Sequence, residues 1–469
     1  MLQITLHNKQ WMTLIVLCLG ELMIVFDTTI VNVALPSIRT DLGFSETSLV
    51  WVVNAYMLTF GGFLLLVGRL GDFYGHRKVF LIGLVLFTVA SLACGIANSQ
   101  YILIIARATQ GLGGAVVSAV ALSLIMDLFT APSERAKAMG VYGFVCAGGG
   151  SIGVLLGGLL TSAFSWHWIF LVNLPIGIAV FMLCMRLLPN DHVLKNSGNH
   201  DVAGAFAITA SLMLAVYAIV NGNEIGWTSL QTLGTLVVSV ILLCVFLFIE
   251  QHVKTPLVPL GLFRLRNLAI SNITAVMWAA SMFAWFFISA LYMQLVLGYN
   301  PMQVGFAFLP TNLIMAVFSL GISAKLIMHF GIKIPLVLGL LLAAVGLALF
   351  ARMPLQGNFM ADVLPGMVLL GLGAGIAFNS MLLAAMNDVT PNESGLASGI
   401  INTSFMMGGA LGLAILASIA AMQTDKLISN GVIATAALNG GYQLAFGIGA
   451  VFAATGALIS TFLTSKDIV

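Results

Sequence analysis

The sequence predicts an all-α polytopic membrane protein, and three observations lead to this fold class. Of the 469 residues, 60% are hydrophobic and only 7% are charged, whereas soluble domains carry roughly 25% charged residues. The apolar residues gather in runs of the length that a helix needs to cross a bilayer, about 20 residues. The basic residues lie between these runs rather than within them. Such a chain must turn most of its surface toward lipid, and its net charge of +2 argues against a nucleic-acid partner.

Polar breaks divide the chain into fourteen apolar runs, each predicted to be a membrane span. The first run is too long for a cleaved signal peptide, so we keep it as a span. The connections are too short to hold a soluble domain. The predicted spans are 11–33, 48–68, 79–98, 101–126, 138–161, 168–188, 203–221, 231–250, 269–296, 303–325, 334–352, 362–386, 397–422 and 442–464.

The positions of the 18 Lys and Arg residues test this count. If the N-terminus is cytoplasmic and the sides alternate, a strong positive-inside bias appears, and a missed span would destroy it. We therefore expect both termini in the cytoplasm. The residues placed inside are Lys9, Arg69, Arg77, Lys78, Arg135, Lys137, Arg186, Lys195, Lys254, Arg264, Arg266, Lys325, Lys333 and Lys466. Those placed outside are Arg39, Arg352 and Lys426, and Arg107 lies within a span.

A weak internal repeat links the inside turns after the second and tenth spans. Aligning Gly75 with Gly331 also pairs Arg77 with Lys333. Because these turns hold corresponding places in two sets of six spans, the repeat favours a duplicated fold. The predicted organisation is an N-terminal six-helix bundle at 1–190, two inserted transmembrane helices with linkers at 191–260, and a C-terminal six-helix bundle at 261–469.

Five segments form motifs that follow one another in a fixed order. They are Asp27–Pro36, Gly68–Lys78, Arg107–Gly113, Trp166–Pro175 and Tyr292–Pro310. Together they resemble the signatures of the major facilitator superfamily, specifically its fourteen-helix drug:proton antiporter branch. The resemblance covers nearly the whole chain. It implies a major facilitator fold with two six-helix bundles plus two extra transmembrane helices, and a monomeric protein of the bacterial inner (plasma) membrane.

The same resemblance implies a function, namely the proton-coupled export of lipophilic, often cationic compounds by alternating access. Protons would be the coupling ion, and no cofactor is implied. Three positions depart from the family pattern. Val154 stands where the fifth-helix signature usually has Pro, His167 where an Arg usually lies between two Trp residues, and Phe405 where relatives often carry Arg.

Three ionisable residues lie well inside the predicted spans, where charge is costly and usually functional. A rise of ~1.5 Å per residue puts Glu21 near the midplane and Asp27 about 24 Å from the inner face. Arg107 enters from the outside and lies about 9 Å below the outer face, at nearly the level of Asp27 in a core ~30 Å thick. We expect Asp27 and Arg107 to form a proton-coupling pair, with a fixed structural pair as the alternative. Glu21 is a further candidate for proton coupling.

The turn after the second span contains the candidate gating residues Gly68, Asp72, Gly75 and Arg77. By resemblance, Asp72 would dock against the N-terminus of a helix in the second half, where the helix dipole favours a carboxylate. The alternative interpretation is that the basic cluster only anchors the loop inside.

An aromatic face in the ninth span is a candidate substrate surface. Trp278, Met282, Trp285 and Tyr292 recur at helical spacing, and aromatic rings bind flat cations by cation–π contacts. Lipid-facing or core packing is the alternative. Glycines spaced by four in the fifth span, at Gly149, Gly153 and Gly157, predict close helix packing. The further polar candidates for substrate binding are Asn32, Gln110, Gln294, Asn379 and Asn402.

Other function classes fit the sequence less well. A transporter of a narrower physiological substrate, such as a siderophore or small metabolite, is the first alternative. A channel or receptor would need a repeated pore motif or a sizeable extramembrane part. No nucleotide-binding GxxxxGK[ST] loop occurs, so ATP-driven transport and enzymatic activity are not expected. His76, His167 and His329 are single, and the five cysteines show no CxxC spacing, so we expect no metal site.

Overall fold

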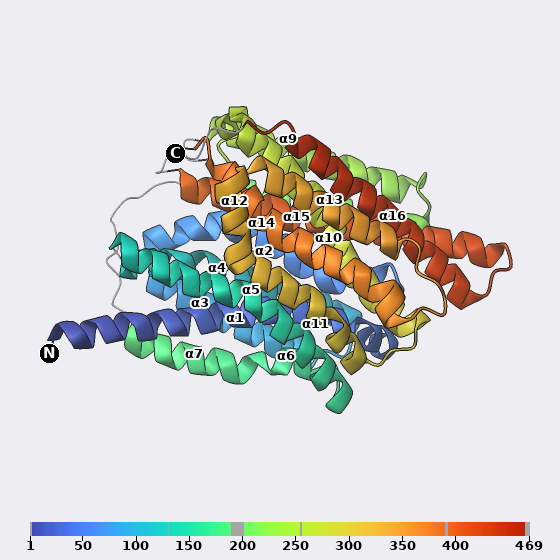
Figure 1. Cartoon of the computed structure of the whole chain (residues 1–469), viewed down its shortest axis with the longest axis horizontal. Helices are drawn as coiled ribbons and strands as arrows, with labels where there is room; N and C mark the ends of the chain where they lie inside the picture. Colours follow the sequence, from blue (N-terminus) through green and yellow to red (C-terminus); the bar gives the residue numbers. More distant parts are fainter. Residues whose placement is uncertain (1, 130, 189–200, 254–255, 390–392, 465–469) are drawn as a thin grey trace.

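The computed structural model describes residues 2–129, 131–188, 201–253, 256–389 and 393–464, and over these ranges it is helical without a β-strand. The α-helices lie roughly side by side along one axis, and α1 begins on the side of the bundle where α16 ends (Figure 1). We call this side the termini end and the opposite side the far end. The α-helices are α1 (Leu2–Leu42), α2 (Trp51–Tyr74), α3 (His76–Gly95), α4 (Gln100–Leu128), α5 (Pro132–Ala163), α6 (Trp168–Leu171), α7 (Asn173–Leu187), α8 (Val202–Ile225), α9 (Leu230–His252), α10 (Arg266–Leu291), α11 (Pro301–Val317), α12 (Ser323–Phe330), α13 (Lys333–Phe350), α14 (Leu364–Met386), α15 (Ser394–Ser429) and α16 (Ala434–Ser460). Short 3₁₀ segments are η1 (Ser48–Val50) and η2 (Leu260–Arg264), and π-helical turns are η3 (Tyr292–Val296), η4 (Phe318–Ile322) and η5 (Phe359–Val363).

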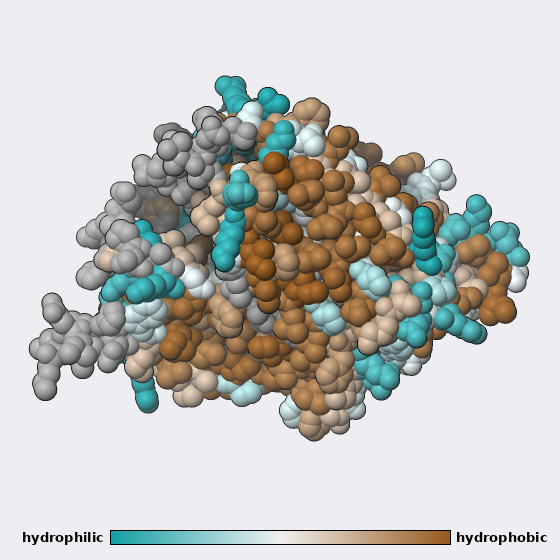
Figure 2. Space-filling view, in the orientation of Figure 1, coloured by the Kyte–Doolittle hydropathy of each residue, from teal (hydrophilic) through white to brown (hydrophobic). Residues whose placement is uncertain are grey.

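The face shown in Figure 2 carries a broad apolar belt between two ends where hydrophilic side chains gather. Twelve helices among the described residues are long and apolar enough to cross a membrane. The belt and these helices together define a multi-pass membrane protein.

The predicted count of fourteen spans is not supported by helix length and composition. The two predicted spans that fall short are 138–161 and 303–325, where the apolar helices are Ile152–Ala163 and Pro301–Val317. Helix α5 itself is continuous from Pro132 to Ala163. In the second case, the π-helical turn η4 joins α11 to α12.

Two glycines end corresponding helices with the same unusual backbone. Gly75 follows α2 with φ 94°, and Gly331 follows α12 with φ 74°. Residues with a Cβ rarely adopt such positive φ values, so glycine suits both positions. Gly226 ends α8 in the same way, with φ 96°, so the internal repeat stays a prediction.

Helix beginnings follow from local capping residues. The Ser99 side chain accepts a hydrogen bond from Ile102 N at the start of α4. Asn300 and Gln303 form a reciprocal capping box at the start of α11, with Pro301 at its first position. These contacts satisfy backbone N–H groups that have no partner inside the helix.

Helix α5 packs closely against α1 through its glycines, as the sequence predicts. A Cβ on Gly153 would lie 3.2 Å from Phe26 Cα, and one on Gly157 would lie 2.7 Å from the Ile30 carbonyl oxygen. Because both neighbours are backbone atoms, side chains at these positions would push the helices apart.

Helix α8, in the predicted inserted pair, touches both sets of helices around it. It packs on α9 and contacts α2 and α15. The Asn223 side chain donates to the Ser418 carbonyl at 2.8 Å, and the Ser418 hydroxyl donates to the Ile219 carbonyl at 2.7 Å. The division of the chain at 190/191 and 260/261 stays a prediction, and the first of these boundaries lies outside the described residues.

Candidate functional site

The centre of the N-terminal part holds a buried charge pair. Asp27 on α1 and Arg107 on α4 have 0% and 1% of their surfaces exposed. Arg107 Nη1 donates to Asp27 Oδ2 at 2.5 Å. The contact expected from their similar depths is therefore confirmed. Isolated charges would be costly here, and pairing offsets that cost.

Further donors surround the Asp27 carboxylate. Gln110 Nε2 lies 2.6 Å and Asn173 Nδ2 lies 3.3 Å from Asp27 Oδ1. Each carboxylate oxygen thus accepts at least one hydrogen bond. Arg107 is held in turn, because its Nε donates to the Val52 carbonyl at 2.8 Å and its Nη1 also donates to Gln110 Oε1 at 2.7 Å.

Sequence reasoning missed part of this network. Asn173 lies within the motif Trp166–Pro175, but the motif does not predict its direct contact with Asp27. Tyr56 was not singled out, yet its ring lies 4.5 Å below the Arg107 guanidinium. Gln110 was proposed as a substrate contact, but here its amide binds Asp27, Arg107 and the Ser91 hydroxyl. These contacts depend on which helices pack against one another, and the spacing of residues along one helix does not show that packing.

The second acidic candidate, Glu21, lies on α1 and is 6% exposed. Its Oε1 accepts a hydrogen bond from the Ser118 hydroxyl at 3.1 Å. The Tyr142 hydroxyl also binds the carboxyl group. Neither partner is charged, so Glu21 differs from Asp27, which faces a guanidinium.

The candidate gating residues surround the junction of α2 and α3. Gly75 forms the sharp turn, and Arg77 Nη2 donates to the Met185 carbonyl at 2.8 Å. Gly68 has open space where a Cβ would lie. The side chain of Asp72 lies outside the described residues, so its docking stays a prediction.

The predicted aromatic face of α10 borders a small apolar cavity. Trp278, Met282 and Trp285 line it together with residues of α11 and α14. Tyr292 does not share this cavity, because its hydroxyl donates to the Pro354 carbonyl at 2.8 Å. The lining residues outside the predicted face are Phe286, Thr311, Met315, Leu370 and Ala374.

The polar substrate candidates are engaged with backbone carbonyls and lie apart from the cavity lining. Asn32, Asn379 and Asn402 donate to the carbonyls of Thr28, Ser319 and Ser398, respectively. Gln294 donates to the Val33 carbonyl at 2.9 Å and thus joins η3 to α1. A role in substrate binding stays a prediction for all four.

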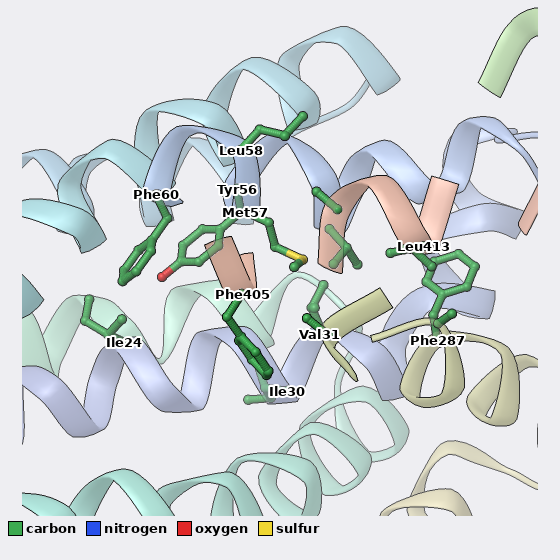
Figure 3. Close-up of a cluster of buried hydrophobic side chains, with 14 of the residues drawn as sticks. Ile24, Ile30, Val31, Tyr56, Met57, Leu58, Phe60, Phe287, Phe405 and Leu413 are labelled. Carbon is green, nitrogen blue, oxygen red and sulfur yellow. The ribbon is translucent and has the colours of Figure 1, made fainter. Parts of the chain in front are cut away.

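Apolar side chains fill the space where the helices of the first part meet those of the second. Figure 3 shows Val31 of α1 and Met57 of α2 near Phe405 and Leu413 of α15. Phe405, which departs from the family pattern, packs edge-on against the rings of Phe283 and Phe378. No charged group takes part in these ring contacts.

Comparison with known proteins identifies the family of the chain. The helices, the apolar belt and the buried charge pair define a polytopic membrane protein. The family model described as Major Facilitator Superfamily matches residues 17–413. The chain therefore belongs to the major facilitator superfamily, in its drug:proton antiporter branch, and it is a transporter rather than an enzyme.

Several relatives carry names that refer to antibiotics. The chain is 37% identical to the puromycin resistance protein pur8 of Streptomyces alboniger, over 94% of this chain and 89% of that protein. It is 36% identical to the cephamycin export protein CmcT of Amycolatopsis lactamdurans, covering 88% and 85%. It is 34% identical to the multidrug resistance protein Stp of Mycobacterium tuberculosis, covering 89% and 77%.

A solved structure shares the fold. A POT family peptide transporter, described as auto-inhibited, superposes with a TM-score of 0.67 at 15% identity, covering 97% of this chain and 98% of that one. At this identity the likeness concerns the fold alone.

Proposed function

We propose that the protein exports lipophilic, often cationic, antibiotic-like compounds in exchange for protons. The observation that carries the proposal is the buried Asp27–Arg107 pair with its ring of amide donors. Drug export follows from the relatives, whose names refer to resistance against, or export of, chemically different antibiotics. Proton coupling follows from the chemistry of a buried carboxyl group that can gain or lose its countercharge.

The coupling step is a switch in the partners of Asp27. In the conformation described, Arg107, Gln110 and Asn173 all donate to the carboxylate. Alternating access would separate α1 from α4 or α7, and the carboxylate would lose donors. It would then take up a proton from the side to which it is open, and substrate release would accompany that step.

Glu21 would serve the cationic substrates. Its carboxyl group has hydroxyl partners but no positive partner among the contacts that surround it. A cation that enters between α1, α4 and α5 would supply the missing charge. This role makes Glu21 secondary to Asp27 for neutral compounds.

The substrate is proposed to reach the α10 cavity lined by Trp278, Met282 and Trp285. The cavity is small and is lined by α10, α11 and α14, all in the C-terminal part of the chain. Apolar rings and a flexible Met suit substrates of varied shape. Asp72, Gly75 and Arg77 would control access from the termini end.

We propose further that the chain crosses the membrane fourteen times, with both termini in the cytoplasm. Helix α5 is 32 residues long, about 48 Å at the usual rise per residue. Helices α11 and α12 are joined by η4 into one helical stretch from Pro301 to Phe330. Labelling of single cysteines by a membrane-impermeant reagent tests this topology. Residues 189–202 should react only from inside and residues 222–230 only from outside, and reaction of both from one side would exclude it.

The transport proposal is tested by export of a fluorescent lipophilic cation from cells that express the protein. Expression should lower cellular accumulation, and a protonophore should restore it. A panel of antibiotics should show reduced susceptibility in the same cells. Export that continues unchanged with the protonophore would contradict proton coupling, and unchanged susceptibility to every compound would favour a narrower physiological substrate.

A further inference from the structure

Two buried carboxyl groups outside the central site lie at the base of the α8–α9 pair. Asp201 directly precedes α8, Glu250 lies in the last turn of α9, and they are 3% and 4% exposed. One oxygen of each has a backbone donor. Asp201 Oδ1 accepts from Gly204 N at 2.7 Å, and Glu250 Oε2 accepts from Val258 N at 3.1 Å.

The other oxygen of each carboxyl group has no donor among the described atoms. These oxygens are Asp201 Oδ2 and Glu250 Oε1. The two carboxyl groups also interact with one another, both by charge and by a side-chain hydrogen bond. Two ionised carboxylates are acceptors only and repel each other, so a hydrogen bond between them requires a proton on one of them.

The described charged groups near Glu250 come from α2 and from the start of α8. Among the described residues, the charged groups that act on Glu250 are Asp201 and Arg69 of α2. Arg69 Nη2 donates to the Pro256 carbonyl at 2.5 Å. His252, on the same helix as Glu250, is exposed, and its Nδ1 lies 2.8 Å from the Phe248 carbonyl oxygen.

Two side chains bind the short segment from Pro256 to Val258. Glu250 binds Val258 N, and Arg69 binds the carbonyl of Pro256 two residues earlier. Further along α8 from Asp201, this helix approaches α2 so closely that a Cβ on Gly62 would lie 3.0 Å from Thr209 Cβ. The carboxyl pair therefore stands where the α8–α9 pair is fastened to α2, next to the turn that contains the candidate gate.

We propose that Asp201 and Glu250 form a second proton-binding site, in which one shared proton fastens the α8–α9 pair to the end of α2. When the proton leaves, two adjacent negative charges remain, and the segment at Val258 loses its fixed position. The site is separate from Asp27 and does not depend on the proposed export function.

Thermal unfolding of the purified full chain as a function of pH tests the proposal. Near neutral pH the folded protein holds the shared proton, whereas the unfolded chain has already released it. The unfolding temperature should therefore fall as the pH is raised from acidic to mildly alkaline. Glu250→Gln supplies a permanent donor and should remove this part of the pH dependence. Glu224→Gln, the same change at the other end of α8, is the matched control and should behave like the parent.

Infrared spectroscopy gives a second measurement that does not depend on stability. A protonated carboxyl group has a C=O band distinct from that of a carboxylate. In a Glu21→Gln background, this band should be present at neutral pH, lost in both Glu250→Gln and Asp201→Asn, and kept in Glu224→Gln. If the band is absent from that background, or survives both substitutions, the shared proton does not exist. The Asp201→Asn protein keeps the cap oxygen for Gly204 and serves as the test should Glu250→Gln fail to fold.

Discussion

Helices α5 and α11 pack closely against one another, and Gly158 is the position at which to test whether this contact keeps the far end of the bundle closed. A Cβ on Gly158 would lie 2.7 Å from the Pro301 carbonyl oxygen and 3.0 Å from Met302 Cα. Both are backbone atoms, so Gly158→Ala can be accommodated only if the helices separate. Overpacking of this kind costs about 1–3 kcal/mol. The ratio of far-end-open to far-end-closed molecules should therefore rise about 5- to 150-fold.

The matched control lies on the same helix. A Cβ on Gly150 would meet only a methyl group of Thr29 at 3.6 Å, which is an ordinary contact. Spin labels at Ala163 and Met302, in a protein whose native cysteines are replaced by serine, report the distance between α5 and α11. Gly158→Ala should increase the population with the longer distance, and Gly150→Ala should leave it unchanged. Equal distance distributions in both variants would refute the account of far-end closure.

Three further predictions concern single side chains. Trp285→Phe should change the resistance profile unevenly across compounds at equal protein levels, because Trp285 lines the α10 cavity; a uniform loss in susceptibility assays would indicate packing alone. Glu21→Gln should reduce export of cations several-fold more than export of neutral compounds, and equal effects in a paired efflux assay would remove its proposed role. Burial raises the pKa of Glu46, in the loop after α1, although the ion pair with Arg39 opposes the shift. Stability should therefore fall as pH rises from the ordinary Glu range through this raised pKa, and Glu46→Gln should flatten that part of a thermal unfolding profile; an unchanged profile would contradict this assignment.

The charge pair could be predicted from sequence because depth depends only on counting residues. Asp27 and Arg107 enter from opposite sides, and the rise per residue brings them to one level. Their amide partners could not be found in this way. Gln110 shares a helix with Arg107, but Asn173 comes from α7, and no periodicity shows that α7 lies beside α1.

The aromatic face shows where helical spacing stops being informative. Trp278, Met282 and Trp285 follow the α-helical period and do border one cavity. Tyr292 directly follows the end of α10, beyond the residues that line the cavity, and its hydroxyl donates to the Pro354 carbonyl instead.

Substrate-induced proton release from reconstituted vesicles tests the central claim most directly. Asp27→Asn removes the titratable group and nearly keeps the side-chain volume, so the protein should still fold. The parent protein should release protons when substrate is added and should accumulate substrate against its gradient. The Asp27→Asn protein should do neither above background. If it releases protons and accumulates substrate like the parent, Asp27 is not the coupling residue, and the account of the Asp27–Arg107 site is wrong.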